Sequence, residues 1–217
     1  MTLFNYLISI SDKKYADFSK SLSNSDYVVI GVKIPVLRDI IKQNKDNSEL
    51  DPNDFELGKY LEIDFIYFGL SLIRLKTSKE QLEFLKKNIG KAKSWAITDT
   101  ISSYVKKLSF EEFFAFFNDC YLSNETYKRR MAYILALKQY KDNDILKVLT
   151  LIQLNEEYMV MMAEAWLLSV IAIAHEDKVF NYLKDCQDIS LKRKTISKIC
   201  DSFRFSEESK NRFKSLR

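Results

Sequence analysis

The feature that most constrains this chain is a series of helix-capping residues, each standing just ahead of a short segment with helical hydrophobic spacing. Ser109 is followed three positions later by Glu112, which is a capping-box pattern, and Ser94 directly precedes Trp95. Only 4 Gly and 2 Pro occur among 217 residues, so few positions interrupt a helix. The pattern predicts an all-α chain of about a dozen short helices joined by turns of a few residues.

The expected helices follow from hydrophobic spacing and from their caps. We expect helices over 2–22, 36–42, 51–60, 62–76, 79–89, 95–107, 110–121, 125–140, 144–154, 156–174, 176–184, 190–200 and 206–215. The expected caps are Ser78, Ser94, Ser109, Ser123 or Asn124, Asn143 and Asn155. Residues 27–35 look strand-like but have no partner strand, so we expect an extended connection, with Pro35 in the first turn of the next helix.

Segment 62–76 is apolar nearly all round, which places it in the interior. Strongly apolar helices that alternate with amphipathic ones are typical of HEAT-type solenoids, in which antiparallel helix pairs stack into a curved array. No exact repeat is visible, and a globular bundle is the competing architecture. We expect the curved α-solenoid of HEAT-like antiparallel helix pairs, in a single domain over residues 1–217.

The distribution of charge and the use of cysteine indicate which ligands and which cellular compartment suit the chain. The net charge is only +4, but residues 184–217 hold 10 Lys and Arg against 5 Asp and Glu. Such a basic segment suits a polyanion, although an ordinary solvated helix face has the same composition. The 3 Cys lie far apart with no CxxC spacing, and the N-terminus lacks the pattern of a signal peptide. Segment 158–174 is short for a membrane span and carries Glu164, so we expect a buried helix in a cytoplasmic protein.

Common catalytic patterns are missing from the sequence. The single His excludes a His metal cluster and an obvious Ser-His-Asp triad, and no glycine-rich phosphate loop occurs. Trp95 and Asp99 lie four residues apart, so they share one helical face, although a half-buried Trp beside a solvent-exposed Asp is also common. Residues 127–132 place cations at a helix start, where they oppose the helix dipole, and Trp166 lies on the most apolar helix.

With these motifs in this order, the chain resembles the DNA alkylation repair (AlkD-like) family of HEAT-repeat proteins. The similarity runs along most of the chain, and each motif alone is short. The motifs that carry it are the Gly31–Pro35 connection, Ser94–Asp99 with its Trp-x-x-x-Asp spacing, the Arg129-Arg130 pair, Ala163-x-x-Trp166, and Leu191-Lys192-Arg193.

The resemblance implies a DNA glycosylase that excises cationic N3- or N7-alkylpurines from damaged double-stranded DNA. It implies these roles: Asp99 as the catalytic carboxylate, Trp95 and Trp166 as aromatic walls against the lesion nucleotide, Arg130 or its neighbour Arg129 on the DNA backbone at the lesion, and Lys192 and Arg193 on phosphates further along. We expect a monomer that needs no cofactor or metal and does not bind a membrane.

Four departures from the family pattern support a second hypothesis. Ala96 stands where catalytic members can carry a second Trp, and Leu167-Leu168-Ser169 follows Trp166 where they tend to show an Arg-Glu pair. Met162 replaces a frequent Lys, and 21–26 is a polar turn with an acid where active members have a basic helical segment. Each change removes positive charge or contact area from the DNA face. The second hypothesis is a catalytically inactive paralogue that acts as a DNA- or protein-binding module.

Overall fold

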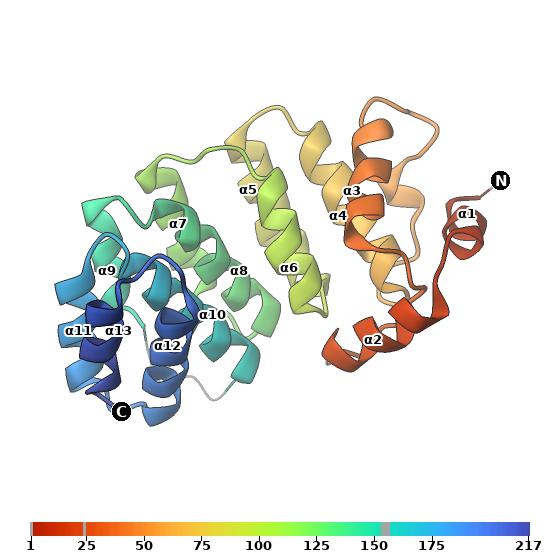
Figure 1. Ribbon diagram of the computed structural model, residues 1–217. Helices are drawn as coiled ribbons and strands as arrows, with labels where there is room; N and C mark the ends of the chain where they lie inside the picture. Colours follow the sequence, from red (N-terminus) through yellow and green to blue (C-terminus); the bar gives the residue numbers. More distant parts are fainter. Residues whose placement is uncertain (1, 24, 153–156) are drawn as a thin grey trace. The chain divides into compact units, whose positions relative to one another are not determined.

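The computed structural model describes residues 2–23, 25–152 and 157–217, and these residues are helical apart from turns, connections and one isolated parallel β-bridge between Val28 and Tyr60 (Figure 1). The predicted all-α class is confirmed. The chain divides into two compact units, Met1–Leu108 and Ser109–Arg217, which we describe separately as the first and the second unit. A single solenoid domain over 1–217 stays a prediction.

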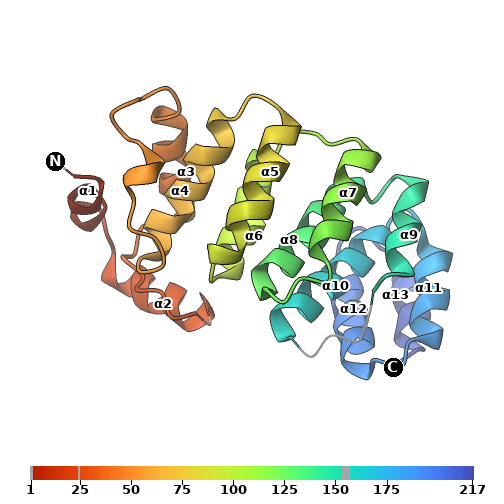
Figure 2. The ribbon, with the colours of Figure 1, turned by 180° about the vertical axis from the view of Figure 1, so that it is seen from behind.

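The bounds of the helices are as follows. In the first unit they are α1 (Leu3–Ser9), α2 (Lys13–Ser23), α3 (Ile34–Gln43), α4 (Leu61–Arg74), α5 (Ser78–Asn88) and α6 (Trp95–Ile101), with 3-10 turns at Pro52–Asp54, Ile89–Lys91 and Ser102–Tyr104. In the second unit they are α7 (Phe110–Cys120), α8 (Thr126–Ala136), α9 (Leu146–Leu149), α10 (Tyr158–Ile171), α11 (Glu176–Asp185), α12 (Ile189–Asp201) and α13 (Glu207–Lys214), with 3-10 turns at Leu137–Gln139 and Asn143–Ile145 (Figure 2).

Helix α4 is the centre of the first unit, as its apolar sequence predicts. Every residue from Leu61 to Leu70 is buried, and the helix packs against α3 and α6. Gly69 permits the close approach of α3, because a Cβ at this position would lie 2.3 Å from the Ile41 Cδ1 atom. The interior position expected for segment 62–76 is therefore confirmed over 62–70 and at Leu72, whereas the rest of 71–76 is partly or fully exposed.

The extended connection is also confirmed, and it is held by a carboxylate. Glu62 accepts hydrogen bonds from the backbone N–H groups of Ile30, Gly31 and Val32 at 2.9, 2.8 and 3.2 Å. Gly31 has a φ of +104°, and a Cβ there would lie 2.4 Å from the Asp12 carbonyl oxygen, so only glycine fits without a shift. Contrary to the expectation of no partner, Val28 pairs with Tyr60 in the single bridge.

Several predicted boundaries are wrong. Segment 2–22 is two helices, since the Asp12 Oδ1 atom accepts from the N–H groups of Lys14 and Tyr15 at 2.8 and 3.2 Å and starts α2 afresh. Segment 51–60 forms only the 3-10 turn at Pro52–Asp54, because the backbone becomes extended at Phe55, and Gly58 further on has a φ of +88°. Helix α6 ends at Ile101 and continues as a 3-10 turn rather than to residue 107.

The caps agree with the sequence at some helices and differ at others. Ser94 and Ser109 cap α6 and α7 as predicted, and Glu112 completes the capping box at Ser109. Thr77 rather than Ser78 caps α5, with Glu80 as its capping-box partner. Asp142 rather than Asn143 caps the 3-10 turn that follows it, and Glu125 rather than Ser123 or Asn124 precedes α8. The expected cap Asn155 lies outside the described residues.

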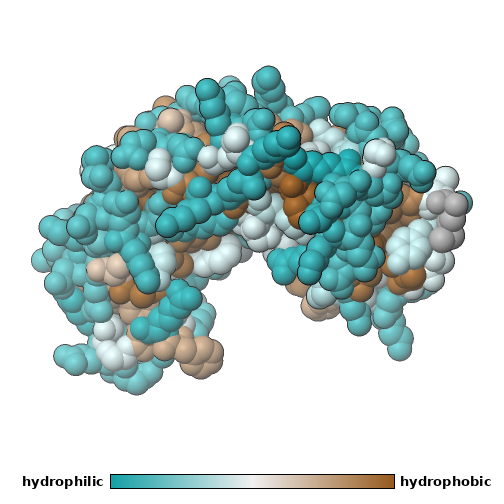
Figure 3. All heavy atoms as spheres, turned by 90° about the horizontal axis from the view of Figure 1, so that it is seen from above, coloured by the Kyte–Doolittle hydropathy of each residue, from teal (hydrophilic) through white to brown (hydrophobic). Residues whose placement is uncertain are grey.

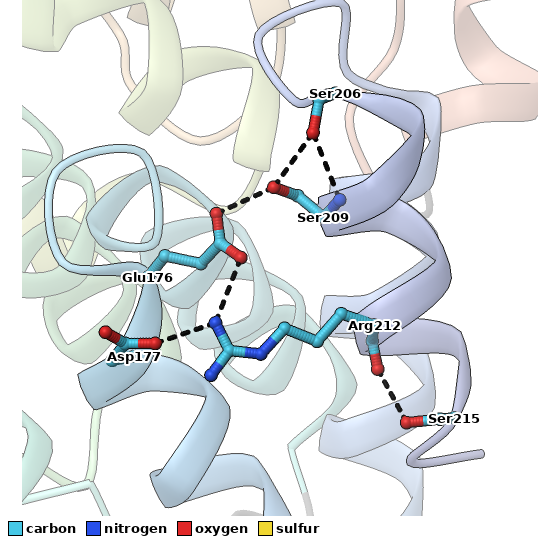
Figure 4. Close-up of polar contacts among 6 residues, drawn as sticks. All are labelled: Glu176, Asp177, Ser206, Ser209, Arg212 and Ser215. Atoms are coloured by element: carbon cyan, nitrogen blue, oxygen red, sulfur yellow. Dashed lines mark hydrogen bonds and ion pairs between the residues drawn. The ribbon is translucent and has the colours of Figure 1, made fainter.

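In the second unit, α10 packs against α8 on one side and α12 on the other, and Figures 1 and 2 show these three as neighbouring helices. Helix α13 is attached to α11 by polar contacts (Figure 4). The Arg212 Nη1 atom lies 3.2 Å from Glu176 Oε1 and 2.7 Å from Asp177 Oδ1, and Ser209 donates to Glu176 at 2.8 Å. These contacts hold α13 on the first turn of α11.

The face drawn in Figure 3 is mostly hydrophilic, with hydrophobic atoms in smaller patches between the charged side chains. No helix within residues 2–23, 25–152 and 157–217 combines the length and the hydrophobicity that a membrane span needs.

Candidate active site

Helix α6 carries the first two predicted site residues. The buried Ser94 side chain caps it by accepting a hydrogen bond from the Ala96 N–H at 3.2 Å. Trp95 is the first residue of the helix and Asp99 lies one turn further on, so both side chains leave the same face. Both are partly exposed to solvent. The predicted pairing of an aromatic ring with a carboxylate is therefore present in the first unit.

Trp95 is fixed by its indole nitrogen. The Nε1–H group donates to the Leu22 carbonyl at 3.1 Å, which ties the ring to the last turn of α2. Because Nε1–H is the only donor of an indole and it is engaged here, a ligand of Trp95 would contact the ring carbons and the ring face. Such a contact suits a flat or cationic partner.

Asp99 is held beside a buried hydroxyl. The Thr98 Oγ1 atom lies 3.1 Å from Asp99 Oδ1 and 3.1 Å from the Trp95 carbonyl oxygen, and Thr98 is fully buried. The Ser102 hydroxyl donates to the Asp99 backbone carbonyl at 2.7 Å. The single Thr98 hydroxyl proton has two acceptors, the Trp95 carbonyl and the Asp99 carboxylate, whereas Ser102 fixes the Asp99 backbone. The Thr98 contact lies on one carboxylate oxygen, so it favours one orientation of a group that could stabilise a developing positive charge.

A buried network behind α6 fixes where this helix begins. The Tyr27 phenol donates to Asp64, and the Gly58 N–H donates to the same carboxylate at 3.0 Å. Tyr27 in turn accepts from the N–H of Lys93, the residue before the Ser94 cap, at 3.2 Å. Burial raises the pKa of Asp64, against the two hydrogen bonds and the nearby Lys93 charge, which lower it. The network joins α4 to the start of α6.

Sequence reasoning missed Glu62 and Asp64, although Glu62 holds the extended connection and Asp64 is linked through Tyr27 to the start of α6. Their signal is present in the sequence, since two acids stand in the first turn of a helix that is otherwise apolar. A buried carboxylate needs donors. The extended connection supplies them to Glu62, and Tyr27 and Gly58 supply them to Asp64.

In the second unit, the two arginines of α8 are less exposed than a phosphate-binding role suggests. Arg130 is only 5% exposed, and its Nη1 atom donates to the Met159 carbonyl at the start of α10. Arg129 is partly buried, and both its charge and the fully buried Glu164 act on Tyr133. Burial and the Glu164 carboxylate raise the pKa of Tyr133, while the Arg129 charge opposes the rise. The Met159 carbonyl offsets part of the cost of placing the Arg130 cation at the start of this helix.

Trp166 projects from α10 into a groove of about 590 Å³ and is 37% exposed. The ammonium of Lys198, on α12, lies 5.9 Å from the centroid of its ring. Lys192 and Arg193 lie in the first turns of α12, where Lys192 is partly buried and Arg193 is exposed. The three helices α8, α10 and α12 pack together, so the second unit brings the remaining candidate residues onto neighbouring helices.

A family model described as "DNA alkylation repair enzyme" matches residues 5–199. The chain belongs to the DNA alkylation repair enzyme family. The matched residues include all seven candidate site residues and end within α12. The family resemblance inferred from the sequence is confirmed.

A solved structure has a similar fold. It is described as a predicted DNA alkylation repair enzyme from Enterococcus faecalis, and it matches with a TM-score of 0.70 at 16% sequence identity. The alignment covers 88% of this chain and 98% of the other. At this identity the match shows a shared fold. A search of curated proteins finds no match.

Proposed function

We propose that the protein is a monofunctional DNA glycosylase that excises cationic N3- or N7-alkylpurines from double-stranded DNA, with Asp99 as its catalytic carboxylate. The observation that carries this proposal is the pairing on α6, where the Asp99 carboxylate is held by the buried Thr98 hydroxyl one turn from the partly exposed Trp95 ring. Membership of the DNA alkylation repair enzyme family supports DNA as the substrate.

The chemistry needs little beyond a well-placed negative charge. An alkylated purine carries a positive charge, so when the bond from the sugar C1′ to the purine breaks, the electron pair leaves with the base and neutralises it. The sugar becomes an oxocarbenium ion, and water adds to C1′ with loss of a proton to give an abasic site. A carboxylate about 4 Å from the cation contributes roughly 4 kcal/mol at an effective dielectric near 20, or about a thousandfold in rate.

The aromatic and basic residues have supporting roles in this proposal. The faces of Trp95 and Trp166 contact the lesion nucleotide. The N–H of Trp95 is already bonded to the Leu22 carbonyl, so Trp95 contributes through its ring. Phosphate contacts come from Arg129, Arg130, Lys192 and Arg193. Among these, Arg193 is the exposed one.

The test compares base release from DNA containing N7-methylguanine by the wild type, Asp99→Asn and Asp39→Asn. Asp39 is an exposed acid on α3 in the same unit and serves as the matched control. Asp99→Asn keeps the shape of the side chain but removes the charge, so we expect base release to fall by about a thousandfold while DNA affinity stays equal or rises. Equal release by Asp99→Asn and the control, at equal thermal stability, would eliminate the catalytic role.

The burial of Arg130 favours a second candidate function, which is DNA binding without excision. Its guanidinium is engaged by the Met159 carbonyl, which reduces what it offers to a phosphate at the lesion. A wild-type protein that binds duplex DNA but releases no base from any cationic alkylpurine would support this second candidate.

A further inference from the structure

Helix α2 is attached to the first unit by polar contacts rather than by core packing, and Figures 1 and 2 show it at the edge of this unit. None of its residues from Lys13 to Leu22 is buried, and the apolar side chains of Phe18 and Leu22 are exposed. An element that buries little apolar surface opens at a low cost in free energy. The position of α2 therefore depends on the contacts at its two ends.

The N-terminal end of α2 lies against Gly31. The Asp12 N–H donates to the Gly31 carbonyl at 3.0 Å, and a Cβ on Gly31 would lie 3.0 Å from the Ala16 Cβ. Glu62 in turn accepts a hydrogen bond from the Gly31 N–H at 2.8 Å. This end of the helix is therefore fixed on the extended connection.

The C-terminal end of α2 depends on the ammonium of Lys20. The Lys20 Nζ atom donates to the carbonyls of Ser25 and Tyr27, both at 2.7 Å. Tyr27 is a firm anchor, because it is only 1% exposed and its phenol contacts Asp64 and the Lys93 N–H. The helix dipole also favours a cation in the last turn. Lys20 thus ties the last turn of α2 to a buried residue of the unit.

The Trp95 ring is bonded to this same turn of α2. A helix ends with carbonyls that have no donor within the helix, and Leu22 offers one of them to the Trp95 Nε1–H group at 3.1 Å. Leu22 stands only two positions after Lys20. A shift of the turn therefore moves or breaks the hydrogen bond that orients the indole.

We propose that Lys20 is a positioning residue for Trp95, because its ammonium fixes the last turn of α2 and with it the carbonyl that holds the indole. The use of this ring against a lesion nucleotide rests on the proposed function, whereas the link between Lys20 and the ring orientation does not. A lysine on an exposed helix beside a candidate DNA site is otherwise interpreted as a phosphate contact. The two carbonyl bonds of its ammonium favour the positioning role.

The first experiment measures the Trp95 ring directly and needs no DNA. The chain has only 2 Trp, so in a Trp166→Phe background all Trp emission comes from Trp95. Lys20→Met keeps the side-chain stem but removes the ammonium, so we expect the emission to shift, its anisotropy to fall and its quenching by acrylamide to rise about twofold. Lys20→Arg still offers donors to both carbonyls and should restore the wild-type signals. Lys14→Met, at an exposed lysine of the same helix, is the matched control.

Hydrogen exchange tests the same link from both sides. Lys20→Met should speed exchange of the amides in the last turn of α2 about tenfold, whereas the amides of α4 should exchange as in the wild type. Because coupling between two sites is reciprocal, Trp95→Phe, which removes the indole N–H, should also speed exchange in this turn. Unchanged exchange in both variants would overturn the inference.

DNA binding and base release separate a positioning role from a phosphate contact. In Lys20→Met we expect the rate of base release from N7-methylguanine DNA at saturating enzyme to fall about tenfold, because the ring is no longer held in place. The slope of log affinity against log salt should equal that of Lys14→Met. A slope smaller than that of the control by about 0.9, with Trp95 emission unchanged, would make Lys20 a phosphate contact and overturn the inference.

A failure of the proposed function gives a different result. If Lys20→Met changes the Trp95 emission and the exchange of α2 as expected, but the wild type releases no alkylated base, the glycosylase proposal is refuted and the role of Lys20 in orienting Trp95 stands. If the Trp95 emission of Lys20→Met equals that of Lys14→Met, the role of Lys20 is refuted whatever the activity of the wild type.

Discussion

The Tyr27 phenol donates a hydrogen bond to the Asp64 carboxylate, and this contact joins the extended connection before α3 to the central helix α4. The same phenol accepts from the Lys93 N–H, two residues before Trp95. One buried hydroxyl thus lies between the core of the first unit and the start of the helix that carries Asp99. The position of α6 depends on this polar link as well as on the apolar packing of α4 against α6.

Replacing Tyr27 by Phe tests this link directly. The variant keeps the ring but removes one donor from a buried carboxylate, so we expect a loss of about 1–3 kcal/mol in the free energy of unfolding. We also expect base release to fall more than the loss of folded protein explains, because the start of α6 loses a fixed point. Tyr6→Phe, at an exposed tyrosine of α1, is the control for chemical denaturation and base release. Unchanged stability of Tyr27→Phe would show that the link contributes nothing.

The raised pKa of Asp64 predicts that the stability of the fold depends on pH. Burial raises its pKa in the folded state above the ordinary 3.8, so the folded state binds this proton more tightly than the unfolded chain does. The stabilisation from this group is fully present below pH 3.8 and is lost as pH rises through the raised pKa. We therefore expect the unfolding free energy of the wild type, relative to Asp64→Asn, to increase as pH is lowered toward that value. If the difference in unfolding free energy between the wild type and Asp64→Asn stays constant as the pH is lowered to 3.8, the pKa of Asp64 is not raised.

Some elements of the fold can be predicted from the sequence and others cannot, and particular residues show why. Helix α4 and the Ser94 and Ser109 caps could be predicted, since apolar spacing and capping act over a few neighbouring residues. The break at Asp12 was missed because apolar residues continue across it, although an Asp is itself a capping signal.

The candidate site was predictable only in part. The i, i+4 spacing of Trp95 and Asp99 places them on one helix face without knowledge of the tertiary structure. Their partners Leu22 and Tyr27 lie far away in the sequence, so no local pattern indicates them. The burial of Arg130 could not be predicted either, because the Met159 carbonyl that accepts from it belongs to another helix.

Thr98 should affect catalysis through its contact with Asp99. Thr98→Val keeps the buried volume but removes the hydroxyl that lies 3.1 Å from the Asp99 carboxylate, so we expect base release to fall about tenfold with DNA affinity unchanged. Thr98→Ser restores a hydroxyl and should recover most of the activity. Thr100→Val, on the same helix, is the control for the loss of a threonine hydroxyl. Equal activity of Thr98→Val and Thr100→Val would mean that Asp99 needs no such support.

Arg130 and Arg193 should respond differently to replacement, although both are candidates for phosphate contacts. Arg130 is buried and donates to the Met159 carbonyl, so Arg130→Ala should lower the free energy of unfolding by about 1.5–3 kcal/mol, as for a lost hydrogen bond to a charged group. Arg193 is exposed on α12, so Arg193→Ala should leave stability within about 0.5 kcal/mol. Its effect should appear in DNA binding, where the loss of one phosphate contact reduces the salt slope by about 0.9. Urea unfolding and salt-dependent anisotropy on the same two variants measure both quantities.

If Arg130→Ala proved as stable as the wild type yet lost the larger share of DNA affinity, Arg130 would contact DNA directly despite its burial, and the argument for binding without excision would lose its structural basis.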